Sequence, residues 1–423
     1  MSIKIDQKGR GKFKPASDYS IDDVKRVLHE KIIEENSKVL HSGIDSDYLS
    51  SIKYVPNKIN VISLFSGCGG LDLGFELAGL AAVIGEESAM AAFQSKEIYS
   101  IARHKSIFHT IYTNDLFKEA NESYKANFPD VFQHGIDIRK VRNFPKADLV
   151  VGGFPCPGFS EAGPRLIDDE RNFLYIHFIR CITQAEPDVF VAENVKGMMT
   201  LGKGEVIKQI TEDFAACGYD VQYKLLASQD YGVPQLRERV FIVGVKKGLG
   251  FKYKYPKPTH GSSKGLLPFV TLQEAIGDLE ASPGPYFTGS YSSIYMSRNR
   301  KKRWDEQSFT IQASGRQAPL HPSGVPMEKV DKDKWIFPDG EEAHRRLSVR
   351  EIARIQTFPD WFTFSDGGNM NVTENNRLDK QYKQIGNAVS VLLAKAVADP
   401  IAKWAVEHLQ KRNIDDTQQL QLF

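Results

Sequence analysis

VISLFSGCGGLDLGF, residues 61–75, is an apolar run followed at once by a glycine-rich turn. A strand that passes through such a turn into a helix lets a cofactor approach bare backbone, so we expect a cofactor loop here. The glycines do not fit the dinucleotide fingerprint, because the third glycine of G-x-G-x-x-G falls on Asp72. The turn therefore argues against a nicotinamide-dependent dehydrogenase, and a tight turn without a ligand is the alternative.

Further apolar runs alternate with helical stretches along the chain, at Ala147–Val151, Val189–Val191 and Val240–Gly244. This alternation predicts an α/β fold with a mostly parallel sheet. Residues 245–344 break the rhythm and are rich in Gly, Pro, Ser, Lys and Arg, and helical periodicity returns at 349–356 and 389–409. We therefore expect a second, smaller and irregular domain inserted into the α/β domain.

The composition argues against several classes of protein. The cysteines form no CxxC pair and no zinc-type cluster, so neither disulfides nor a bound metal are expected; they are Cys68, Cys156, Cys181 and Cys217. No apolar run approaches the roughly 20 residues that cross a bilayer, and the polar start of the chain lacks a secretion signal. These features predict a cytoplasmic protein without a membrane segment.

Cys156 is the candidate nucleophile. It stands between Pro155 and Pro157 on a loop that follows an apolar strand ending at Val151. Active sites of open α/β sheets form at such strand ends, and flanking prolines restrict the loop and favour an accessible thiol. A small buried apolar residue is the ordinary alternative for a single cysteine.

Glu193 is the candidate acid, because it ends the next strand, in Val191-Ala192-Glu193-Asn194-Val195. A carboxylate at the same sheet edge is suited to protonate or hydrogen-bond a ring nitrogen while the thiol attacks. A solvated surface glutamate is the alternative. A thiol, a carboxylate and a glycine loop at strand ends together favour an enzyme over a binding module without activity.

Five motifs occur in the order that is typical of the cytosine-C5 DNA methyltransferases, and the chain resembles that family over about residues 59–404. The motifs are Phe65-Ser66-Gly67-Cys68-Gly69-Gly70, Pro155-Cys156, Glu193-Asn194-Val195, Gln235-Leu236-Arg237-Glu238-Arg239 and Gly386-Asn387-Ala388-Val389. The resemblance implies a Rossmann-like S-adenosylmethionine-dependent methyltransferase domain. It also implies methyl transfer to carbon 5 of a cytosine that is flipped out of duplex DNA. Pro157 and Ser390 depart from the usual family residues without removing a reacting group.

The resemblance implies catalytic roles for four residues. Cys156 matches the thiol that adds to carbon 6 of cytosine, and Glu193 matches the carboxylate that contacts N3 and the exocyclic amine. Arg237 and Arg239 match the arginines that hold the flipped base and the nucleotide backbone. An exposed basic pair is the alternative, but strand alternation places both arginines on one side.

The resemblance also implies S-adenosylmethionine as the cofactor. The loop that holds its methionine side matches five residues, which are Phe65, Gly67, Gly69, Gly70 and Leu71. A side chain added at Gly69 is therefore expected to intrude where backbone meets the cofactor.

Polar residues outside this loop complete the predicted cofactor site. Asp137 matches the family's acid near the adenine amine, and Asn387 matches a late loop that closes beside the cofactor. The ribose acid stays open between Asp115, which precedes a family-like helix, and Glu86 or Glu87, which lie nearer the expected distance from the glycine loop. A helix cap or a solvated charge is the alternative for each acid.

Residues 294–322 resemble the recognition region of bacterial methyltransferases that act on GGCC or on GGCC split by a central base pair. Arginines that read guanine are expected among Arg298, Arg300 and Arg316, with Gln317 beside them. Phosphate contacts are expected from Lys301, Lys302 and Arg303. A solvated charge run is the alternative for 298–303. The transfer-RNA branch of the family shares the catalytic motifs, but the large insertion favours DNA.

These arguments predict five segments along the chain. They are an N-terminal extension with a helix from Ile21 to Leu40 (1–58), the catalytic and cofactor-binding domain (59–244), a target-recognition domain (245–344), a C-terminal segment that completes the catalytic domain (345–410) and a mobile tail (411–423). Double-stranded DNA and a companion restriction endonuclease acting on the same site are the expected partners of a monomer in the bacterial cytoplasm.

Overall fold

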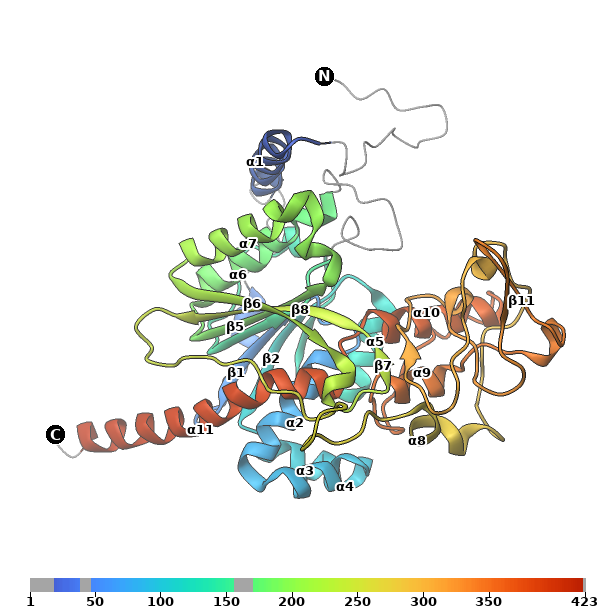
Figure 1. Cartoon of the computed structure of the whole chain (residues 1–423). Helices are drawn as coiled ribbons and strands as arrows, with labels where there is room; N and C mark the ends of the chain where they lie inside the picture. The colour runs from blue at the N-terminus through green and yellow to red at the C-terminus, as the bar shows by residue number, and fades with distance from the viewer. Residues whose placement is uncertain (1–18, 39–46, 156–169, 421–423) are drawn as a thin grey trace. The chain divides into compact units, whose positions relative to one another are not determined.

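The computed structural model describes residues 19–38, 47–155 and 170–420 (Figure 1). The chain divides into two compact units. Unit 1 comprises residues 1–51, 136–225 and 238–250, and unit 2 comprises residues 52–135, 226–237 and 251–423. Each unit is therefore built from segments that lie far apart in the sequence. That residues 245–344 form a target-recognition domain stays a prediction.

Unit 2 contains three parallel strands in the order β3-β2-β1, with the bounds β1 (Ile59–Leu64), β2 (Phe108–Asn114) and β3 (Phe132–His134). Every residue of β1 is buried. This explains the continuous apolar run, because a strand covered on both faces has no polar side to alternate with. The predicted strand is confirmed, but it ends at Leu64, and Phe65 already belongs to the turn with φ 53°.

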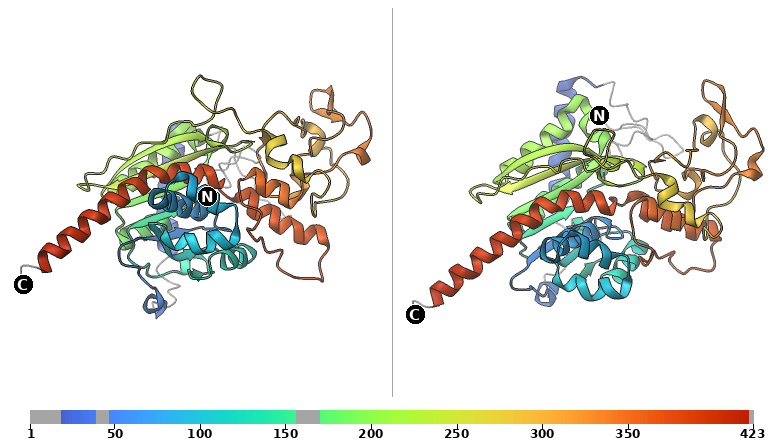
Figure 2. Two further views of the ribbon diagram at one scale, coloured as in Figure 1. Left: turned by 90° about the horizontal axis from the view of Figure 1, so that it is seen from below. Right: turned by 60° about the horizontal axis from the view of Figure 1, so that its bottom comes forward.

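The described part of unit 2 also contains eight α-helices. They are α2 (Gly70–Ile84), α3 (Glu86–Phe93), α4 (Lys96–Ala102), α5 (Lys118–Asn127), α8 (Leu272–Ile276), α9 (Val349–Ile355), α10 (Glu374–Asn387) and α11 (Val391–Leu420). α11 lies along α2 (Figure 2). A methyl group on Gly74 of α2 would stand 2.6 Å from the carbonyl oxygen of Val391, so the two helices approach each other more closely than side chains allow.

The prediction that no apolar segment is long enough to cross a membrane needs correction at α10 and α11. By length and composition alone, Glu374–Gln410 passes that test. Two thirds of its apolar window, 67%, is nevertheless buried inside the protein. Burial against α2 identifies this segment as a core helix of unit 2.

The remaining strands of unit 2 are short. They are β7 (Gln235–Leu236), β9 (Ser308–Phe309), β10 (Glu328–Asp331) and β11 (Lys334–Ile336). β7 pairs with β9 in parallel, and β10 pairs with β11 as a hairpin. The predicted irregular texture of this part of the chain is thus confirmed, since most of its backbone lies in turns and loops.

The described part of unit 1 contains four strands in the order β4-β5-β8-β6, with the bounds β4 (Leu149–Gly152), β5 (Val189–Val195), β6 (Tyr219–Ala227) and β8 (Glu238–Lys246). β4 and β5 are parallel, whereas β5 and β8 are antiparallel. The predicted α/β class with a mostly parallel sheet is confirmed. Its helices are α1 (Ile21–Lys38), α6 (Tyr175–Ala185) and α7 (Glu205–Ala216).

The N-terminal helix α1 matches the predicted helix and packs within unit 1. Val24 and Leu28 are buried, and Val24 lies against Gly202. The carboxylate of Glu35 is also buried, with Oε1 3.0 Å from Nε2 of His177. The extension is therefore part of the unit 1 core along this helix.

Candidate active site

The glycine-rich turn after β1 requires left-handed backbone. Phe65, Gly67 and Gly69 have φ values of 53°, 55° and 94°. The turn is closed by the backbone N–H of Gly69, which donates to the carbonyl of Ser66 at 3.0 Å. Its position between β1 and α2 confirms the predicted strand-turn-helix arrangement, in which N–H groups at a helix N-terminus face outward.

The three glycines of the turn have different neighbours. A methyl group on Gly69 would stand 2.6 Å from the Phe128 ring, and one on Gly70 would stand 2.6 Å from the carbonyl oxygen of Val389. Among the described residues, no atom lies within 4 Å of a methyl group placed on Gly67. The expectation that a side chain at Gly69 intrudes on a ligand is therefore wrong, because protein atoms already fill that space. Gly67 faces the open side of the turn.

Asp115 lies beside this turn at the end of β2. Its Oδ2 accepts a hydrogen bond from the N–H of Gly67 at 2.8 Å, and its Oδ1 accepts one from Phe117 at 2.7 Å. Burial raises the pKa of the Asp115 carboxyl, although these backbone hydrogen bonds oppose the shift. Glu86 instead pairs with Lys395 at 2.8 Å. Of the alternative acids, the geometry favours Asp115 as the neighbour of the glycine turn.

The other predicted cofactor residues occupy varied positions. Leu71 is buried in α2. The carboxylate of Asp137 pairs with Arg139 at 2.6 Å, and its pKa is lowered because these hydrogen bonds outweigh burial. Asn387 is exposed and is the last residue of α10, so the expected late loop is a helix end.

The acid of the predicted catalytic set has a fixed partner in unit 1. Oε1 of Glu193 on β5 lies 2.8 Å from Nε of Arg239 on β8, and both side chains are nearly buried. Burial lowers the pKa of the Arg239 guanidinium, and the carboxylate of Glu193 opposes that shift. A methyl group on Gly153 would stand 2.8 Å from Oε2 of Glu193. The carboxylate therefore lies against the backbone that leads to Pro155 and Cys156.

Cys156 itself lies outside the described residues. The segment before it is held by a residue absent from the predicted catalytic set, Asn194, whose Nδ2 donates to the carbonyl of Phe154 at 3.1 Å. The sequence could have indicated Asn194, because it follows Glu193 directly in the motif Glu193-Asn194-Val195. An amide at that position anchors the strand end from which the loop departs.

Arg237 and Arg239 do not share one environment. The guanidinium of Arg237 is buried in unit 2 and donates to main-chain carbonyls of Ile311 (3.2 Å), Gly386 (2.9 Å) and Ala388 (2.9 Å). Arg239 belongs to unit 1 and pairs with Glu193. Strand alternation does not support the expectation that both arginines face one side, because Arg237 falls in the break between β7 and β8.

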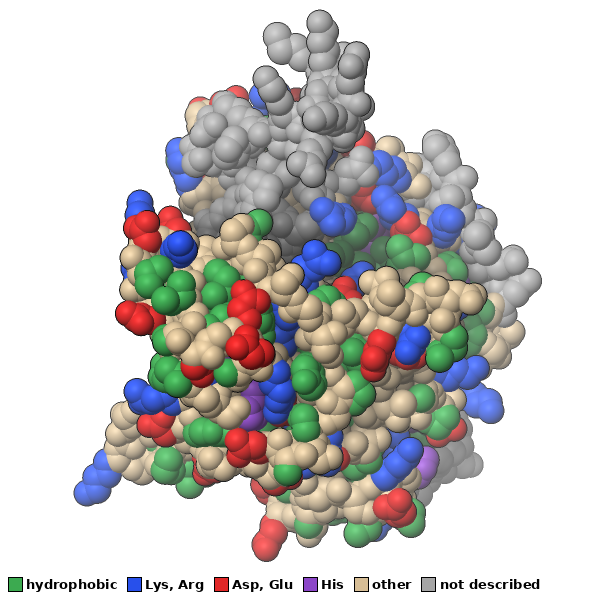
Figure 3. Space-filling model, turned by 90° about the vertical axis from the view of Figure 1, so that its right-hand side faces the viewer, with side chains coloured by type: hydrophobic (Ala, Val, Ile, Leu, Met, Phe, Trp, Pro, Cys, Tyr) green, Lys and Arg blue, Asp and Glu red, His purple; other side chains and the backbone are tan. Residues whose placement is uncertain are grey.

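The predicted DNA-reading residues separate by exposure. Arg298 and Arg316 are exposed, and Gln317 is partly exposed. Within the described part of the chain, the side chains of Arg298 and Arg316 make no hydrogen bond or ion pair. Basic, acidic and apolar side chains are interspersed on the described face that Figure 3 draws. Of the arginines predicted to read guanine, these two therefore remain available to a ligand.

Arg300 and Lys301 are buried, with 5% exposure each. Arg300 covers the Tyr295 ring, donates from Nε to the Tyr295 carbonyl at 3.1 Å and donates from Nη2 to Oε1 of Gln317 at 2.9 Å. Lys301 donates to the carbonyl of Val325 and contacts Nδ1 of His344, both at 2.9 Å. The structure thus places both residues in the interior, contrary to the expected contacts with bases and phosphates.

Lys302 and Arg303 have acidic partners near the surface. Nζ of Lys302 lies 2.9 Å from Oε1 of Glu306, and Nε of Arg303 lies 2.9 Å from Oδ1 of Asp305. Arg303 is well exposed, so phosphate contact remains open to it. The described residues contain no group of three His, Cys, Asp or Glu side chains suited to a metal ion.

Comparisons with known proteins identify similar methyltransferases. The chain is 72% identical to the type II methyltransferase M.BsuRI of Bacillus subtilis over 97% of its length and 94% of that protein. It is 64% identical to M.BspRI of Lysinibacillus sphaericus over the full length of both. The fold resembles the Dnmt2 methyltransferase of S. pombe, with a TM-score of 0.54 and 16% identity over 84% of this chain and all of that one.

A match to a family model assigns the chain to a protein family. Residues 59–403 match the C-5 cytosine-specific DNA methylase model, which covers most of the chain and both units. The predicted Rossmann-like methyltransferase fold and the predicted enzyme class are thereby confirmed. The chain belongs to the C-5 cytosine-specific DNA methylase family.

Proposed function

We propose that this enzyme methylates carbon 5 of a flipped-out cytosine in duplex DNA with Cys156 as its covalent nucleophile. The observation that carries the proposal is the position of Glu193. Its carboxylate is held by Arg239 and lies against Gly153, three residues before Cys156. A carboxylate fixed beside the chain that carries the thiol is the arrangement that this chemistry requires.

The reaction follows from the weakness of carbon 5 as a nucleophile. The thiolate of Cys156 forms a bond to carbon 6, and the C5–C6 electron pair then gives carbon 5 enamine character. N3 takes up a proton from solvent as the ring gains electrons, and the Glu193 carboxylate accepts hydrogen bonds from N3–H and from the exocyclic amine, which stabilises the charge that develops in the ring. That proton leaves N3 again when the thiolate is expelled. After carbon 5 is methylated, loss of its proton returns the electron pair to the ring and expels the thiolate.

Arg239 is proposed to orient Glu193 rather than to act on the ring. A buried carboxylate without a counter-ion would take up a proton, and the guanidinium 2.8 Å away favours the charged form. Arg239 makes a further hydrogen bond, in which Nη1 donates to the Glu238 carbonyl at 2.8 Å. This hydrogen bond fixes the guanidinium along β8. The pair therefore places a carboxylate of defined orientation at the strand end.

The glycine turn fits S-adenosylmethionine. Gly67 is open, Asp115 lies 2.8 Å from the N–H of Gly67, and Oγ of Ser66 is buried without a hydrogen-bond partner among the described residues. We assign the methionine side to the turn at Phe65 and Gly67, and the ribose to Asp115. When bound, the cofactor supplies an electrophilic methyl group on its sulfonium.

The target is proposed to be GGCC or GGCC split by a central base pair. Guanine presents O6 and N7 together in the major groove, where an arginine fork bonds both. Exposed Arg298 and Arg316, in the proposed target-recognition domain of residues 245–344, support this assignment. Arg300 is buried against Tyr295 and donates to Gln317, so it is better suited to hold these two residues than to read a base.

The cellular role is proposed from the relatives. The similar proteins M.BsuRI and M.BspRI are named type II methyltransferases, so we place this enzyme in a restriction-modification system, as a monomer in the bacterial cytoplasm. Its methylation then protects host DNA from a companion endonuclease that acts on the same site.

Bisulfite sequencing of DNA from cells that express the enzyme tests the proposal. The expected result is modified cytosine confined to sites with paired GG and CC steps. Modification only at other sites overturns the target and leaves the chemistry standing. Purified enzyme that methylates transfer RNA but not duplex DNA overturns the substrate itself.

A further inference from the structure

Residues Ser314 to Ala318 form a short turn around the 3-10 helix η13 (Gly315–Gln317), which carries the exposed Arg316. Its last residue is held on one side, where Oη of Tyr295 donates to the carbonyl of Ala318 at 2.8 Å. Its middle is held by Arg346, whose Nε donates to the carbonyl of Arg316 at 3.3 Å. The backbone of the turn is therefore fixed, whereas the Arg316 side chain is not.

The start of the turn is held by one acid on α10. Oδ1 of Asp379 accepts hydrogen bonds from the N–H of Gly315 at 2.7 Å and from Oγ of Ser314 at 3.0 Å. Hydrogen bonds to an ionised acceptor are shorter and stronger than neutral ones. A single carboxylate oxygen thus orients two successive residues immediately before Arg316.

The Ser314–Ala318 turn packs tightly against the residues beneath it. A methyl group on Gly315 would stand 2.7 Å from the Phe287 ring and 2.8 Å from the Tyr382 ring. A methyl group on Gly386, farther along α10, would stand 2.6 Å from the backbone nitrogen of Ala313. The turn therefore rests directly on α10, and a shift of its start has to be taken up at Arg316.

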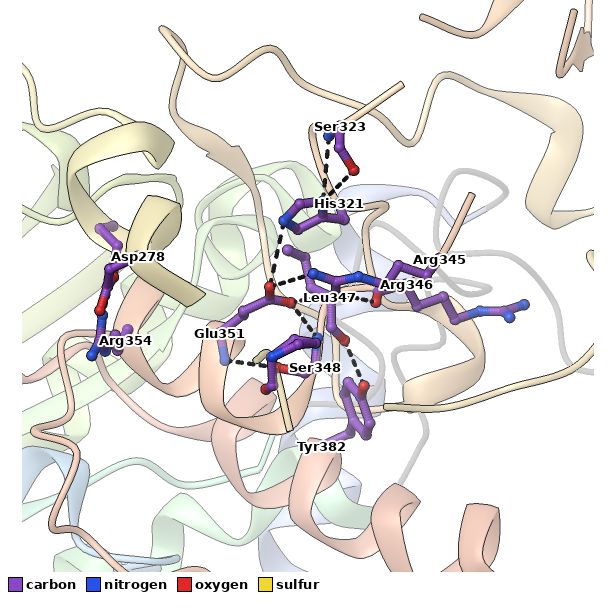
Figure 4. A network of polar contacts seen from close by, with 12 residues as sticks. Asp278, His321, Ser323, Arg345, Arg346, Leu347, Ser348, Glu351, Arg354 and Tyr382 are labelled. Atoms are coloured by element: carbon purple, nitrogen blue, oxygen red, sulfur yellow. Dashed lines mark hydrogen bonds and ion pairs between the residues drawn. The ribbon is translucent and has the colours of Figure 1, made fainter. Parts of the chain in front are cut away.

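Arg346, which also donates to the turn, packs against two tyrosine rings. Its guanidinium lies 4.3 Å from the Tyr291 ring centroid and 5.0 Å from the Tyr295 ring centroid, and Nη1 donates to the Gly289 carbonyl at 2.9 Å. Arg346, Leu347 and Tyr382 appear together in Figure 4, where Tyr382 donates to the carbonyl of Leu347. Arg346 is needed for packing as well as for the turn, so Asp379 offers the cleaner test.

We propose that Asp379 is a positioning residue for target specificity, which fixes the Ser314–Ala318 turn so that Arg316 meets one base pair of the target. The inference rests on the proposed function, because it assumes that Arg316 reads a base. A guanidinium makes a bidentate contact only when its approach is defined, since a tilted fork loses one of the two hydrogen bonds. Loss of the Asp379 contacts therefore reduces discrimination more than it reduces binding to phosphates.

The test compares kcat/KM on a GGCC duplex with kcat/KM on duplexes that carry one substituted base pair. Asp379→Ala is expected to lose about 10-fold or more of the discrimination at one position. Asp379→Asn keeps an acceptor oxygen and is expected to restore most of it. Glu374→Gln, an exposed change in the first turn of α10, is the matched control and leaves the ratio unchanged.

A double variant separates positioning from general damage. If Asp379 acts through Arg316, then Arg316→Ala combined with Asp379→Ala discriminates no worse than Arg316→Ala alone. Additive losses overturn the inference. A selective wild type with an equally selective Asp379→Ala also overturns it, while the proposed function survives. A wild-type enzyme without sequence preference overturns the proposed target and the inference with it.

Discussion

Nε of Arg239 lies 2.8 Å from Oε1 of Glu193, across the antiparallel pair that β5 forms with β8. The register places Arg239 opposite Val195, two residues beyond Glu193, so the contact is a diagonal one along a strand pair. Long side chains reach across such diagonals. The pairing of these strands, rather than a flexible loop, therefore sets the orientation of the acid.

Replacing either member of this pair is expected to change the chemistry in different ways. Glu193→Gln should lower kcat by about 100-fold or more, as removal of a positioned acid does, while DNA affinity stays near the wild-type value. Single-turnover methylation and a filter-binding assay measure the two quantities. Near-normal turnover of Glu193→Gln would contradict the assigned role.

Arg239→Met should move the pH profile instead of abolishing activity outright. Without its cation, the nearly buried carboxylate of Glu193 is left uncompensated, so its charged form is less stable. Where the charged carboxylate is needed, the acid limb of the kcat/KM profile then shifts to higher pH. Arg239→Lys keeps a cation and is expected to show a smaller shift, and identical profiles for all three proteins would argue against the ion pair as the cause.

Cys156→Ala is expected to abolish methyl transfer and to leave DNA binding measurable, because the thiol forms the covalent bond and contributes little to backbone contact. Wild type should form an adduct with duplex DNA that carries 5-fluorocytosine, which denaturing electrophoresis detects. Cys217→Ala, at a partly buried cysteine on the C-terminal end of α7, is the control and should retain the adduct. An adduct with Cys156→Ala would assign the nucleophile elsewhere.

Gly67 and Gly69 should respond differently to alanine. Gly69→Ala brings a methyl group to 2.6 Å from Phe128 and should lower the Tm. Gly67→Ala meets no atom of the described residues and carries mainly the cost of left-handed backbone, about 1 to 2 kcal/mol, but it should weaken S-adenosylmethionine binding more strongly. Calorimetric titration and thermal unfolding distinguish the two, and unchanged cofactor affinity in Gly67→Ala would place the cofactor elsewhere.

Alanine substitutions at the predicted recognition residues should have different effects at exposed and at buried positions. Arg316→Ala and Arg298→Ala are expected to relax preference at one guanine each, by about 1 to 3 kcal/mol, without loss of stability. Arg300→Ala should lower the Tm, because it uncovers Tyr295 and leaves buried groups unpaired. Stable Arg300→Ala with selectively lost reading of one guanine would reinstate Arg300 as a reader.

Acidification should destabilise unit 2 through His321. Burial lowers the pKa of His321 from 6.5 to about 4, and Glu351, which Arg345 holds at 2.7 Å, opposes the shift only in part (Figure 4). A lowering of that size corresponds to roughly 3 kcal/mol of preference for the neutral ring. The unfolded chain binds the proton more readily, so this stability is present above pH 6.5 and is lost as the pH falls toward 4.

The measurement is the Tm between pH 7.5 and 5. His321→Gln has no titrating ring at this position and should lose less Tm over that range than wild type does. An equal loss in both proteins would assign the pH dependence to other groups.

Local pattern was sufficient for four of the strands and for the glycine turn, and it singled out Glu193 as the candidate acid. β1, β4, β5 and β8 are short apolar runs, and a strand buried on both faces is visible in sequence because it leaves no polar alternation. Glu193 was identifiable because strand ends collect chemistry. The helix α10 was missed, since its buried Leu378, Tyr382 and Ile385 are separated by a largely polar sequence.

Which charged side chain is free to act depends instead on contacts between residues that are distant in sequence. Arg298, Arg300 and Arg316 are the same residue type, yet Arg300 is covered by Tyr295 and Gln317, and the other two are exposed. Arg237 is bound by carbonyls up to 151 residues away, and Asp379 reaches back to Gly315. Burial and hydrogen-bond partners arise only when the chain closes on itself, so residue type and spacing could nominate these side chains but could not rank them.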